Sequence, residues 1–476
     1  MKEVVVEKIK TKIVCTIGPS TSSPRMLWRL AKAGMNVARL NLSHNTPAEH
    51  TESVRQIRQV ARKLKTSIGI LFDVPGPKIR VGKLAPDPIS LKTGYQVTLT
   101  GRQMLGDQKI IPISHPRFVR TLNKGDVVFL ADGTIRLNVE AVKKNDVFCR
   151  VIRGGSLFSG KGVNIPSKKL GLRALTHRDV SLLRFALKQG ADFVGLSFTT
   201  TSRDIVKARR IITETKSPAW IIAKIETREA VQNFDDIVQR ADGVMVARGD
   251  LGVEMEVEDI PVLQKQIISK ANAAGKPVIT ATQMLESMVT NPTPTRAEVT
   301  DIANAIIDGT DAIMLSEETA IGRYPLEAVE VMKKVAAATE AALPYRNFLE
   351  ARRPLVEKTQ DAIAFSACEA ALDLDASCIV ANTRTGTTAH RVSKFRSSIP
   401  IVALTPSDPV MDQLSLLWGV YPHMVKRLST TSEIFRAAKS EAIASRTARS
   451  GDRIIVVCGD PSTPGGTTDL LRIQTV

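Results

Sequence analysis

Aromatic side chains make up only 4% of the 476 residues, and no apolar run reaches the length that a membrane-spanning helix requires. The first residues alternate charged side chains with valine, so they lack the uninterrupted apolar segment of a secretory signal. The five cysteines are scattered and form no C-x-x-C pair. These absences predict a protein of the reducing cytoplasm without a membrane partner.

The formal net charge of +18 raises the question of nucleic-acid binding. The basic residues are spread along the chain, and no helix-turn-helix, zinc-finger or RNP string is present. Few aromatic side chains are available to stack on bases. We therefore expect no nucleic-acid partner, and the charge predicts attraction for anionic, phosphorylated small molecules.

Short apolar runs alternate with helix-length amphipathic segments through most of the first 343 residues. Eight runs are typical of buried strands, at residues 12–16, 36–40, 67–73, 192–197, 220–225, 243–247, 277–280 and 312–315. Helices are expected between most of them, and one begins with the capping-box pair Thr176 and Asp179. Eight strand-helix units that close on themselves predict a (β/α)8 TIM barrel.

Two further domains are expected. Residues 77–171 contain short alternating runs broken by Gly, Asn and Asp, which predicts a small β-barrel lid domain inserted over the catalytic face. Residues 344–476 return to alternating helices and strands, which predicts a C-terminal open α/β domain. The barrel would then comprise residues 1–76 and 172–343. The Pro-Gly-Pro segment at 75–77 is interpreted as a stiff hinge or an ordinary turn.

Charged residues end two neighbouring strands within residues 219–250. Lys224 and Glu226 follow the first strand, and Arg248 and Asp250 follow the second. Two close carboxylates repel each other unless a cation lies between them, and such ligands with open positions suit Mg²⁺ or Mn²⁺. Lys224 and Arg248 would neutralise a phosphoryl group bridged to the metal. Either carboxylate alone more often caps the next helix, but the equivalent positions beside cations favour the metal site.

The remaining strand ends are also polar, and barrel enzymes carry their chemistry at this end. They supply Arg39, Asn41, Ser43, Asp73, Ser197, Thr282, Ser316 and Glu317. At the opposite end, Asp192, Asp242 and Asp311 precede their strands, and we assign them a structural role. In the C-terminal domain, the turn at residues 383–388 either binds an anion at a helix start or is an ordinary strand-helix turn.

Several strings resemble pyruvate kinase in the order that this family has them. They are TKIVCTIGPST at 11–21, GMNVARLNLSH at 34–44, AKIE at 223–226, MVARGDLGVE at 245–254, ATQMLESM at 281–288 and PTRAEVTDIANAIIDGTDAIMLSEETA at 294–320. The resemblance covers essentially the whole chain. It implies a cytoplasmic homotetramer that transfers the phosphoryl group of phosphoenolpyruvate to ADP, giving pyruvate and ATP in the last step of glycolysis.

The resemblance also implies residue roles. Lys224 looks like the lysine that stabilises the phosphoryl group in transfer, and Glu226 and Asp250 look like ligands of the divalent ion. Arg39 matches a phosphate-binding residue, and Gly249 and Asp250 match backbone donors to the substrate carboxylate. Thr282 and Ser316 match the site of enolate protonation. The nucleotide contacts are matched by Asn41, Arg80 and Lys161. Thr383, Thr385, Gly386, Thr387 and Thr388 resemble the loop that binds a phosphorylated activator, either a sugar phosphate or a nucleotide.

The chain departs from the family pattern near the proposed hinge. Many members have D-T-K-G-P-E where this chain has DVPGPK at 73–78, so Val74 replaces a threonine that helps bind K⁺ and Lys78 replaces a glutamate. A lysine ammonium can replace a monovalent cation electrostatically. We therefore predict that K⁺ is not required, although Asn41, Ser43 and Asp73 are kept.

Three other departures have no assigned consequence. Glu317 stands where the family has glycine, Ile321 where it has lysine, and Arg173 where it commonly has proline. Two alternatives to the kinase remain open at this point. One is another metal-dependent barrel enzyme acting on phosphoenolpyruvate or a 2-oxo acid, and the other is a non-catalytic basic scaffold or nucleic-acid binder.

Overall fold

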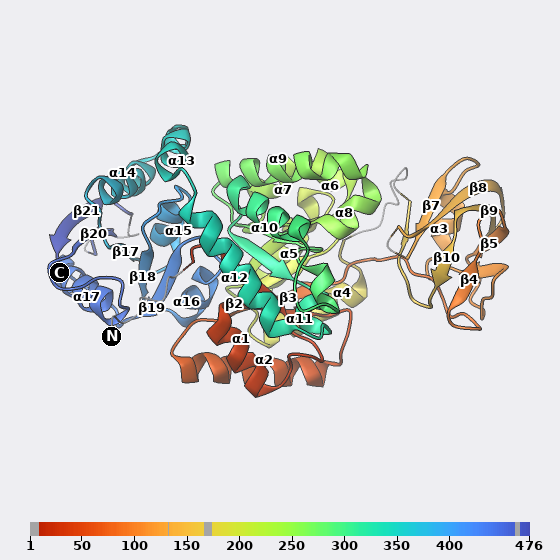
Figure 1. The fold of residues 1–476 in the computed structure, drawn as a ribbon, viewed down its shortest axis with the longest axis horizontal. Coiled ribbons are helices and arrows are strands. Elements are labelled where there is room, and N and C mark those ends of the chain that lie inside the picture. Colours follow the sequence, from red (N-terminus) through yellow and green to blue (C-terminus); the bar gives the residue numbers. More distant parts are fainter. Residues whose placement is uncertain (1–8, 132, 166–173, 462–466) are drawn as a thin grey trace.

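The chain forms three parts that lie in a row, as the computed structural model shows (Figure 1). The structure describes residues 9–131, 133–165, 174–461 and 467–476. A barrel of strands and helices occupies the middle of Figure 1, with the C-terminal domain against one end. The small β domain that we call the lid lies beyond the other end.

The middle part is a closed parallel barrel in the strand order β1-β16-β15-β14-β13-β12-β3-β2. Its strands are β1 (Lys12–Thr16), β2 (Met35–Asn41), β3 (Gly69–Val74), β12 (Phe193–Leu196), β13 (Trp220–Ile225), β14 (Gly243–Ala247), β15 (Val278–Ala281) and β16 (Ala312–Leu315). The predicted (β/α)8 barrel is confirmed. The predicted strand bounds differ from the observed ones by at most two residues at either end.

Helices surround the barrel. They are α1 (Pro24–Ala33), α2 (Pro47–Leu64), α4 (His177–Lys188), α5 (Ser202–Glu214), α6 (Arg228–Gln232), α7 (Phe234–Arg240), α8 (Arg248–Glu254), η1 (Val257–Asp259), α9 (Ile260–Ala273), η2 (Glu286–Val289), α10 (Arg296–Asp308), α11 (Glu317–Ala320) and α12 (Pro325–Ala341). The capping box predicted at Thr176 and Asp179 starts α4, because each side chain bonds the backbone of the other.

The barrel interior is filled by buried apolar side chains from most of its strands, so it is a packed core rather than a pore. Phe193 and Met245 belong to this cluster. Leu416 of the C-terminal domain also belongs to it and is fully buried. The C-terminal domain is therefore packed against the barrel core.

The three aspartates assigned a structural role occupy equivalent positions at the amino ends of the barrel strands. Each accepts a backbone N–H from a neighbouring strand: Asp192 from Ile70, Asp242 from Ile221, and Asp311 from Val278. Each also forms an ion pair with an arginine, Asp192 with Arg58, Asp242 with Arg209, and Asp311 with Arg396. Asp192 and Asp311 are buried, and buried carboxylates need such partners to offset the loss of hydration. Their contacts agree with the expected structural role.

The lid is an all-β domain inserted between β3 and α4. A curled six-stranded sheet in the order β11-β7-β8-β9-β5-β6 is accompanied by the pair β10-β4. Its elements are β4 (Ile89–Leu91), β5 (Gln96–Thr100), β6 (Ile110–Pro112), α3 (Pro116–Thr121), β7 (Val127–Leu130), β8 (Ile135–Lys143), β9 (Asp146–Arg153), β10 (Gly155–Leu157) and β11 (Val163–Asn164). A separate apolar core holds it together.

The C-terminal domain is an open α/β domain, as predicted, and its strands lie in the order β19-β18-β17-β20-β21. Its elements are α14 (Thr359–Asp373), β17 (Cys378–Asn382), α15 (Thr387–Ser393), β18 (Ile401–Thr405), α16 (Asp408–Leu414), β19 (Val420–Met424), α17 (Thr431–Ala444), β20 (Arg453–Cys458) and β21 (Leu470–Thr475). The short helices α13 (Tyr345–Ala351) and η3 (Arg353–Leu355) connect it to α12.

The exact domain boundaries at 76/77 and 343/344 stay predictions, and the boundary at 171/172 lies outside the described residues. Among the residues that the structure describes, no helix combines the length and the apolar character needed to span a bilayer.

Candidate active site

A cavity of about 330 Å³ opens at the carboxyl ends of the barrel strands, on the side facing the lid. It brings together most of the predicted site residues: Arg39, Asn41, Ser43, Asp73, Lys78, Arg80, Lys161, Lys224, Glu226 and Asp250. Ser197 and Glu317, two other predicted strand-end residues, also line it. Parallel strands deliver these side chains to one rim because all their carboxyl ends point the same way.

Lys224 lines this cavity and is almost completely buried. Its Nζ is 2.7 Å from Glu226 Oε1 and 3.1 Å from Asp73 Oδ1, and it donates a 2.6 Å hydrogen bond to Ser197 Oγ. Burial alone would lower the pKa of this amine, but the charges of Asp73 and Glu226 outweigh burial and raise it. Lys224 therefore remains a fixed positive charge.

Arg39 extends from β2 and pairs with the second carboxylate oxygen of Asp73. Its Nη2 and Nε lie 2.6 and 2.9 Å from Asp73 Oδ2, and its Nη1 donates to Thr16 Oγ1 at 2.9 Å. Burial opposes ionisation of Asp73, but Lys224 and Arg39 keep its pKa below the ordinary value. Thr16 was not predicted, although its place at the end of β1 was a signal that could have revealed it.

Glu226 and Asp250 face the cavity from the ends of two adjacent strands. Glu226 is buried, and its Oε2 accepts the backbone N–H of Phe198 at 2.7 Å. Burial and the nearby charge of Asp250 raise the pKa of Glu226 even though Lys224 opposes them. The two carboxylates are thus close enough to repel each other, and a cation between them would relieve that repulsion.

The same two carboxylates are suitable ligands for a hard divalent cation. No group of three His, Cys, Asp or Glu side chains that could hold a metal occurs among the described residues. A metal held by Glu226 and Asp250 would therefore need further oxygen ligands from a substrate or from water.

Lys78 provides a second ammonium group, from the segment that leads into the lid. Its Nζ lies 3.1 Å from Asp250 Oδ1, with both side chains about a quarter exposed. Asn41 and Ser43 also line the cavity, and Asn41 Oδ1 accepts the backbone N–H of Ser43 at 3.0 Å. Lys78, which stands where many family members have glutamate, therefore points into the cavity.

The chain matches two pyruvate kinase family models, the barrel domain at residues 8–329 and the alpha/beta domain at residues 361–474. The chain belongs to the pyruvate kinase family. It is 43% identical to the pyruvate kinase of Thermococcus litoralis over 98% of each chain, and 45% identical to pyruvate kinase 2 of Synechocystis sp. over 98% of this chain and 79% of that one. It is a phosphotransferase of this family.

The fold of the whole chain supports the same assignment. A crystal structure of a pyruvate kinase from Cryptosporidium parvum superimposes with a TM-score of 0.92 at 38% sequence identity. The match covers 98% of this chain and 96% of that chain, so it includes the lid and the C-terminal domain as well as the barrel.

Four predicted site residues of this pyruvate kinase family member lie outside the cavity lining: Gly249, Thr282, Ser316 and Arg248. Gly249 donates its N–H to Thr282 Oγ1 at 2.7 Å, and that hydroxyl is 2.5 Å from the carbonyl oxygen of Ala281. Ser316 lies next to Glu317, and within the described residues its buried Oγ has no hydrogen-bond partner. The structure therefore places this group beside the cavity rather than on its wall.

Arg248 does not point where the sequence suggested. Its guanidinium lies 2.6 Å from Asp301 Oδ1 and donates at 2.7 Å to the carbonyl oxygen of Thr282, and it is absent from the cavity wall formed by the described residues. The expectation that Arg248 neutralises the phosphoryl group is wrong. Helix α8 begins at Arg248, so the strand alternation that would have aimed this side chain at the cavity has ended.

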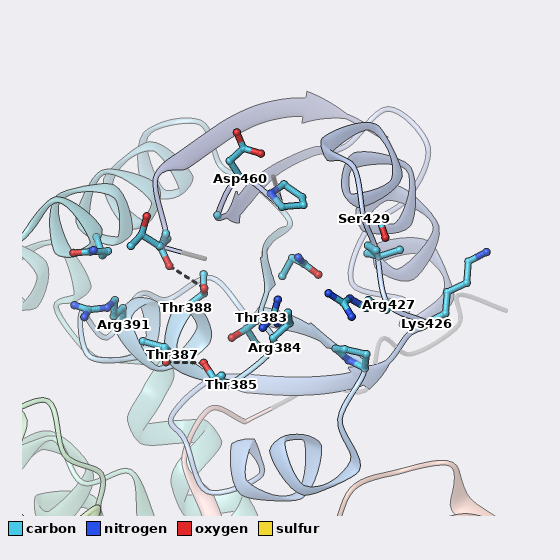
Figure 2. Close-up of a pocket in the computed structure, with 18 residues that line it drawn as sticks. Thr383, Arg384, Thr385, Thr387, Thr388, Arg391, Lys426, Arg427, Ser429 and Asp460 are labelled. Atoms are coloured by element: carbon cyan, nitrogen blue, oxygen red, sulfur yellow. Dashed lines mark hydrogen bonds between the residues drawn. The ribbon is translucent and has the colours of Figure 1, made fainter. Parts of the chain in front are cut away.

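The predicted effector turn lines a separate cavity of about 370 Å³ in the C-terminal domain (Figure 2). Gly386, in the left-handed conformation with φ of 87°, precedes α15, and the hydroxyls of Thr385 and Thr387 lie 3.0 Å apart. Arg384 belongs to this turn, and Figure 2 shows Arg427 among the other side chains that line the cavity.

The basic side chains of this second cavity were not predicted from the sequence. Arg427 and Lys426 come from the loop between β19 and α17, which carries no recognisable anion-binding string. Asp460 also lines this cavity and adds one negative charge to it.

Three residues that depart from the family pattern had no assigned consequence. Glu317 lines the cavity at the barrel strand ends, Ile321 is 56% exposed, and Arg173 lies outside the described residues.

Proposed function

We propose that the chain transfers the phosphoryl group of phosphoenolpyruvate to ADP, giving pyruvate and ATP. The observation that carries this proposal is the buried Lys224 ammonium, fixed between Asp73 and Glu226 in a cavity that also holds Arg39. Phosphoryl transfer needs positioning and charge stabilisation more than a nucleophile, and this cavity supplies fixed positive charge.

Different basic side chains of the chain bind the phosphoryl group and the nucleotide. Arg39 and Lys224 receive the phosphoryl oxygens and stabilise the negative charge that moves during transfer. Asn41, Arg80 and Lys161 contact the nucleotide, and Lys161 does so from the lid. This division fits the shape of the cavity, because Arg80 and Lys161 line the lid side and Arg39 and Lys224 come from the barrel.

Glu226 and Asp250 would hold the divalent cation, Mg²⁺ or Mn²⁺. When bound, such a cation supplies charge neutralisation between the carboxylates and the substrate oxygens. Support comes from the donor set itself, two carboxylates close enough for one to raise the pKa of the other. Lys224 and Lys78, which neutralise these carboxylates, remain beside the substrate.

The backbone N–H groups of Gly249 and Asp250 are the proposed donors to the substrate carboxylate. Gly249 N–H bonds Thr282 Oγ1 in this structure, so binding of the carboxylate requires that hydroxyl to give up the bond. We infer that the released Thr282 hydroxyl then takes part in protonation of the enolate carbon, with Ser316 acting through water.

The finer properties of the enzyme follow from the same residues. Lys78 stands in for the monovalent cation beside Asp250, so K⁺ is not required. The cavity around Thr383, Thr385, Gly386, Thr387 and Thr388 binds a phosphorylated activator, either a sugar phosphate or a nucleotide. Family likeness adds a cytoplasmic homotetramer.

A coupled assay tests the reaction. The purified chain is mixed with phosphoenolpyruvate, ADP and MgCl₂, and both ATP and pyruvate are measured. We expect equal amounts of the two products and no turnover when the divalent ion is chelated. If the folded protein forms no ATP under any effector or metal condition, the proposal is wrong.

A further inference from the structure

The turn after β15 holds two consecutive non-glycine residues in the left-handed region. Thr282 has φ of 69° and Gln283 has φ of 57°. This conformation is unfavourable for a β-branched residue such as threonine, so neighbouring groups must hold it in place. Thr282 is also the residue whose hydroxyl accepts the Gly249 N–H.

Arg248 holds this turn from one side. Its Nη2 donates to the Thr282 carbonyl at 2.7 Å and contacts Met284 Sδ at 2.8 Å, and its Nε lies 3.4 Å from the Ala281 carbonyl. The other end of the guanidinium is fixed by Asp301 at 2.6 Å. The side chain is almost completely buried, so these contacts are not exchanged for water.

Glu318 holds the turn from the other side. This carboxylate is 2% exposed and accepts the backbone N–H of Leu285 at 3.0 Å and that of Ser316 at 2.6 Å. It therefore ties the end of the β15 turn to the residue that follows β16. Thr282 and Ser316, the two hydroxyl residues proposed for the protonation step, are positioned by two buried charges that do not line the cavity.

We propose that Arg248 and Glu318 are positioning residues for protonation of the enolate, a role that rests on the proposed function. After the phosphoryl group has moved to ADP, a new C–H bond forms from the electron pair of the enolate C=C bond. The lone pair on the enolate oxygen becomes the C=O bond, and the proton comes from solvent water through the Thr282 hydroxyl. Arg248 and Glu318 keep that hydroxyl aimed at the carbon.

The test combines Arg248→Met and Thr282→Ala, singly and together. Two rates are measured: turnover with phosphoenolpyruvate and ADP, and exchange of pyruvate methyl hydrogens with D₂O followed by NMR in the presence of MgCl₂ and ATP. We expect Arg248→Met to lower kcat and the exchange rate together by about 10- to 100-fold, with the KM for phosphoenolpyruvate little changed. In the Thr282→Ala background, Arg248→Met should lower neither kcat nor the exchange rate any further.

Arg58→Met is the matched control. Arg58 is also a paired arginine of the barrel, but it bonds Asp192 and Asp412 on the side of the C-terminal domain. We expect this variant to be less stable and yet to keep both rates. If Arg248→Met fails to fold, Glu318→Gln serves instead, because the amide keeps one acceptor and loses the charge.

The outcomes separate the two proposals. If the unmodified protein makes ATP but the Arg248→Met loss persists at full size in the Thr282→Ala background, the positioning role is wrong. A raised KM without loss of exchange would also overturn it, since Arg248 would then act through its neighbours Gly249 and Asp250. If the unmodified protein makes no ATP at all, the proposed function itself fails.

Discussion

The Lys78 ammonium lies 3.1 Å from the Asp250 carboxylate, across the edge between the lid segment and the barrel. A residue that is glutamate in many family members thus brings a fixed positive charge to one of the two proposed metal ligands. At this distance a full charge interacts strongly in a partly buried cavity. This pair is the observation that supports the proposal that Lys78 takes the place of a monovalent cation.

The first prediction concerns K⁺. We expect turnover at saturating substrates to be nearly the same in KCl and in tetramethylammonium chloride of equal ionic strength, because Lys78 supplies the charge permanently. Lys78→Met should lower activity in tetramethylammonium chloride, whereas Lys83→Met, on a lid lysine outside the cavity lining, should not. A large stimulation of the unmodified protein by K⁺ would contradict the substitution.

The second prediction concerns Lys224→Met. Loss of the ammonium should lower kcat by at least about 10³-fold, since charge stabilisation carries the chemistry. Glu226 would lose its ion-pair partner and Asp73 would keep only Arg39, so the melting temperature should fall as well. Lys270→Met, which breaks an exposed pair with Asp235, is the control and should change neither quantity much. Retained turnover in folded Lys224→Met would remove the centre of the mechanism.

The third prediction concerns the C-terminal cavity. Thr385→Glu places a carboxylate beside Thr387 and should abolish activation by a phosphorylated metabolite while turnover without activator is kept. The measurement is a titration of sugar phosphates and nucleotides at low phosphoenolpyruvate concentration. Thr51→Glu, on the exposed face of α2, is the control. An equal loss of activated and basal turnover would argue against an effector site here.

Much of the barrel could be predicted from the sequence, because buried parallel strands appear as short apolar runs at regular spacing. Trp220–Ile225 and Gly243–Ala247 were predicted with their observed bounds. The charged residues directly after such runs, above all Lys224 and Glu226, could then be assigned to the cavity. Strands β10 and β11 of the lid were not predicted, because runs of two or three residues are too short to show a period.

Side-chain direction after a strand could not be predicted. Glu226 faces the cavity because it follows Lys224 by two residues, while Arg248 turns away because α8 begins there. Long-range partners were also missed. Arg427 reaches the effector turn from a loop without a recognisable string, and Arg396 reaches Asp311 across 85 residues of sequence.

His390 is a titratable residue at the contact between the barrel and the C-terminal domain. Its ring lies 6.0 Å from that of Trp220, so α15 contacts β13 of the barrel at this point. Burial, aided by the positive charges of Lys276, Arg396 and Arg391 and opposed by Asp311, lowers the pKa of His390 to about 4. The unfolded chain has a histidine pKa of about 6.5.

The last prediction follows from this difference. Between pH 6.5 and 4 the unfolded chain binds a proton at His390 that the folded chain does not, so the stability contributed here is complete above pH 6.5 and is lost as the pH falls toward 4. The loss amounts to about 3 kcal/mol at most, from about 1.4 kcal/mol for each unit of pKa. His390→Gln should therefore be less sensitive to acid than the unmodified protein when the melting temperatures at pH 7.5 and 4.5 are compared. His177→Gln, on an exposed histidine, should keep the full difference, and an unchanged pH response of His390→Gln would show that the acid sensitivity arises elsewhere.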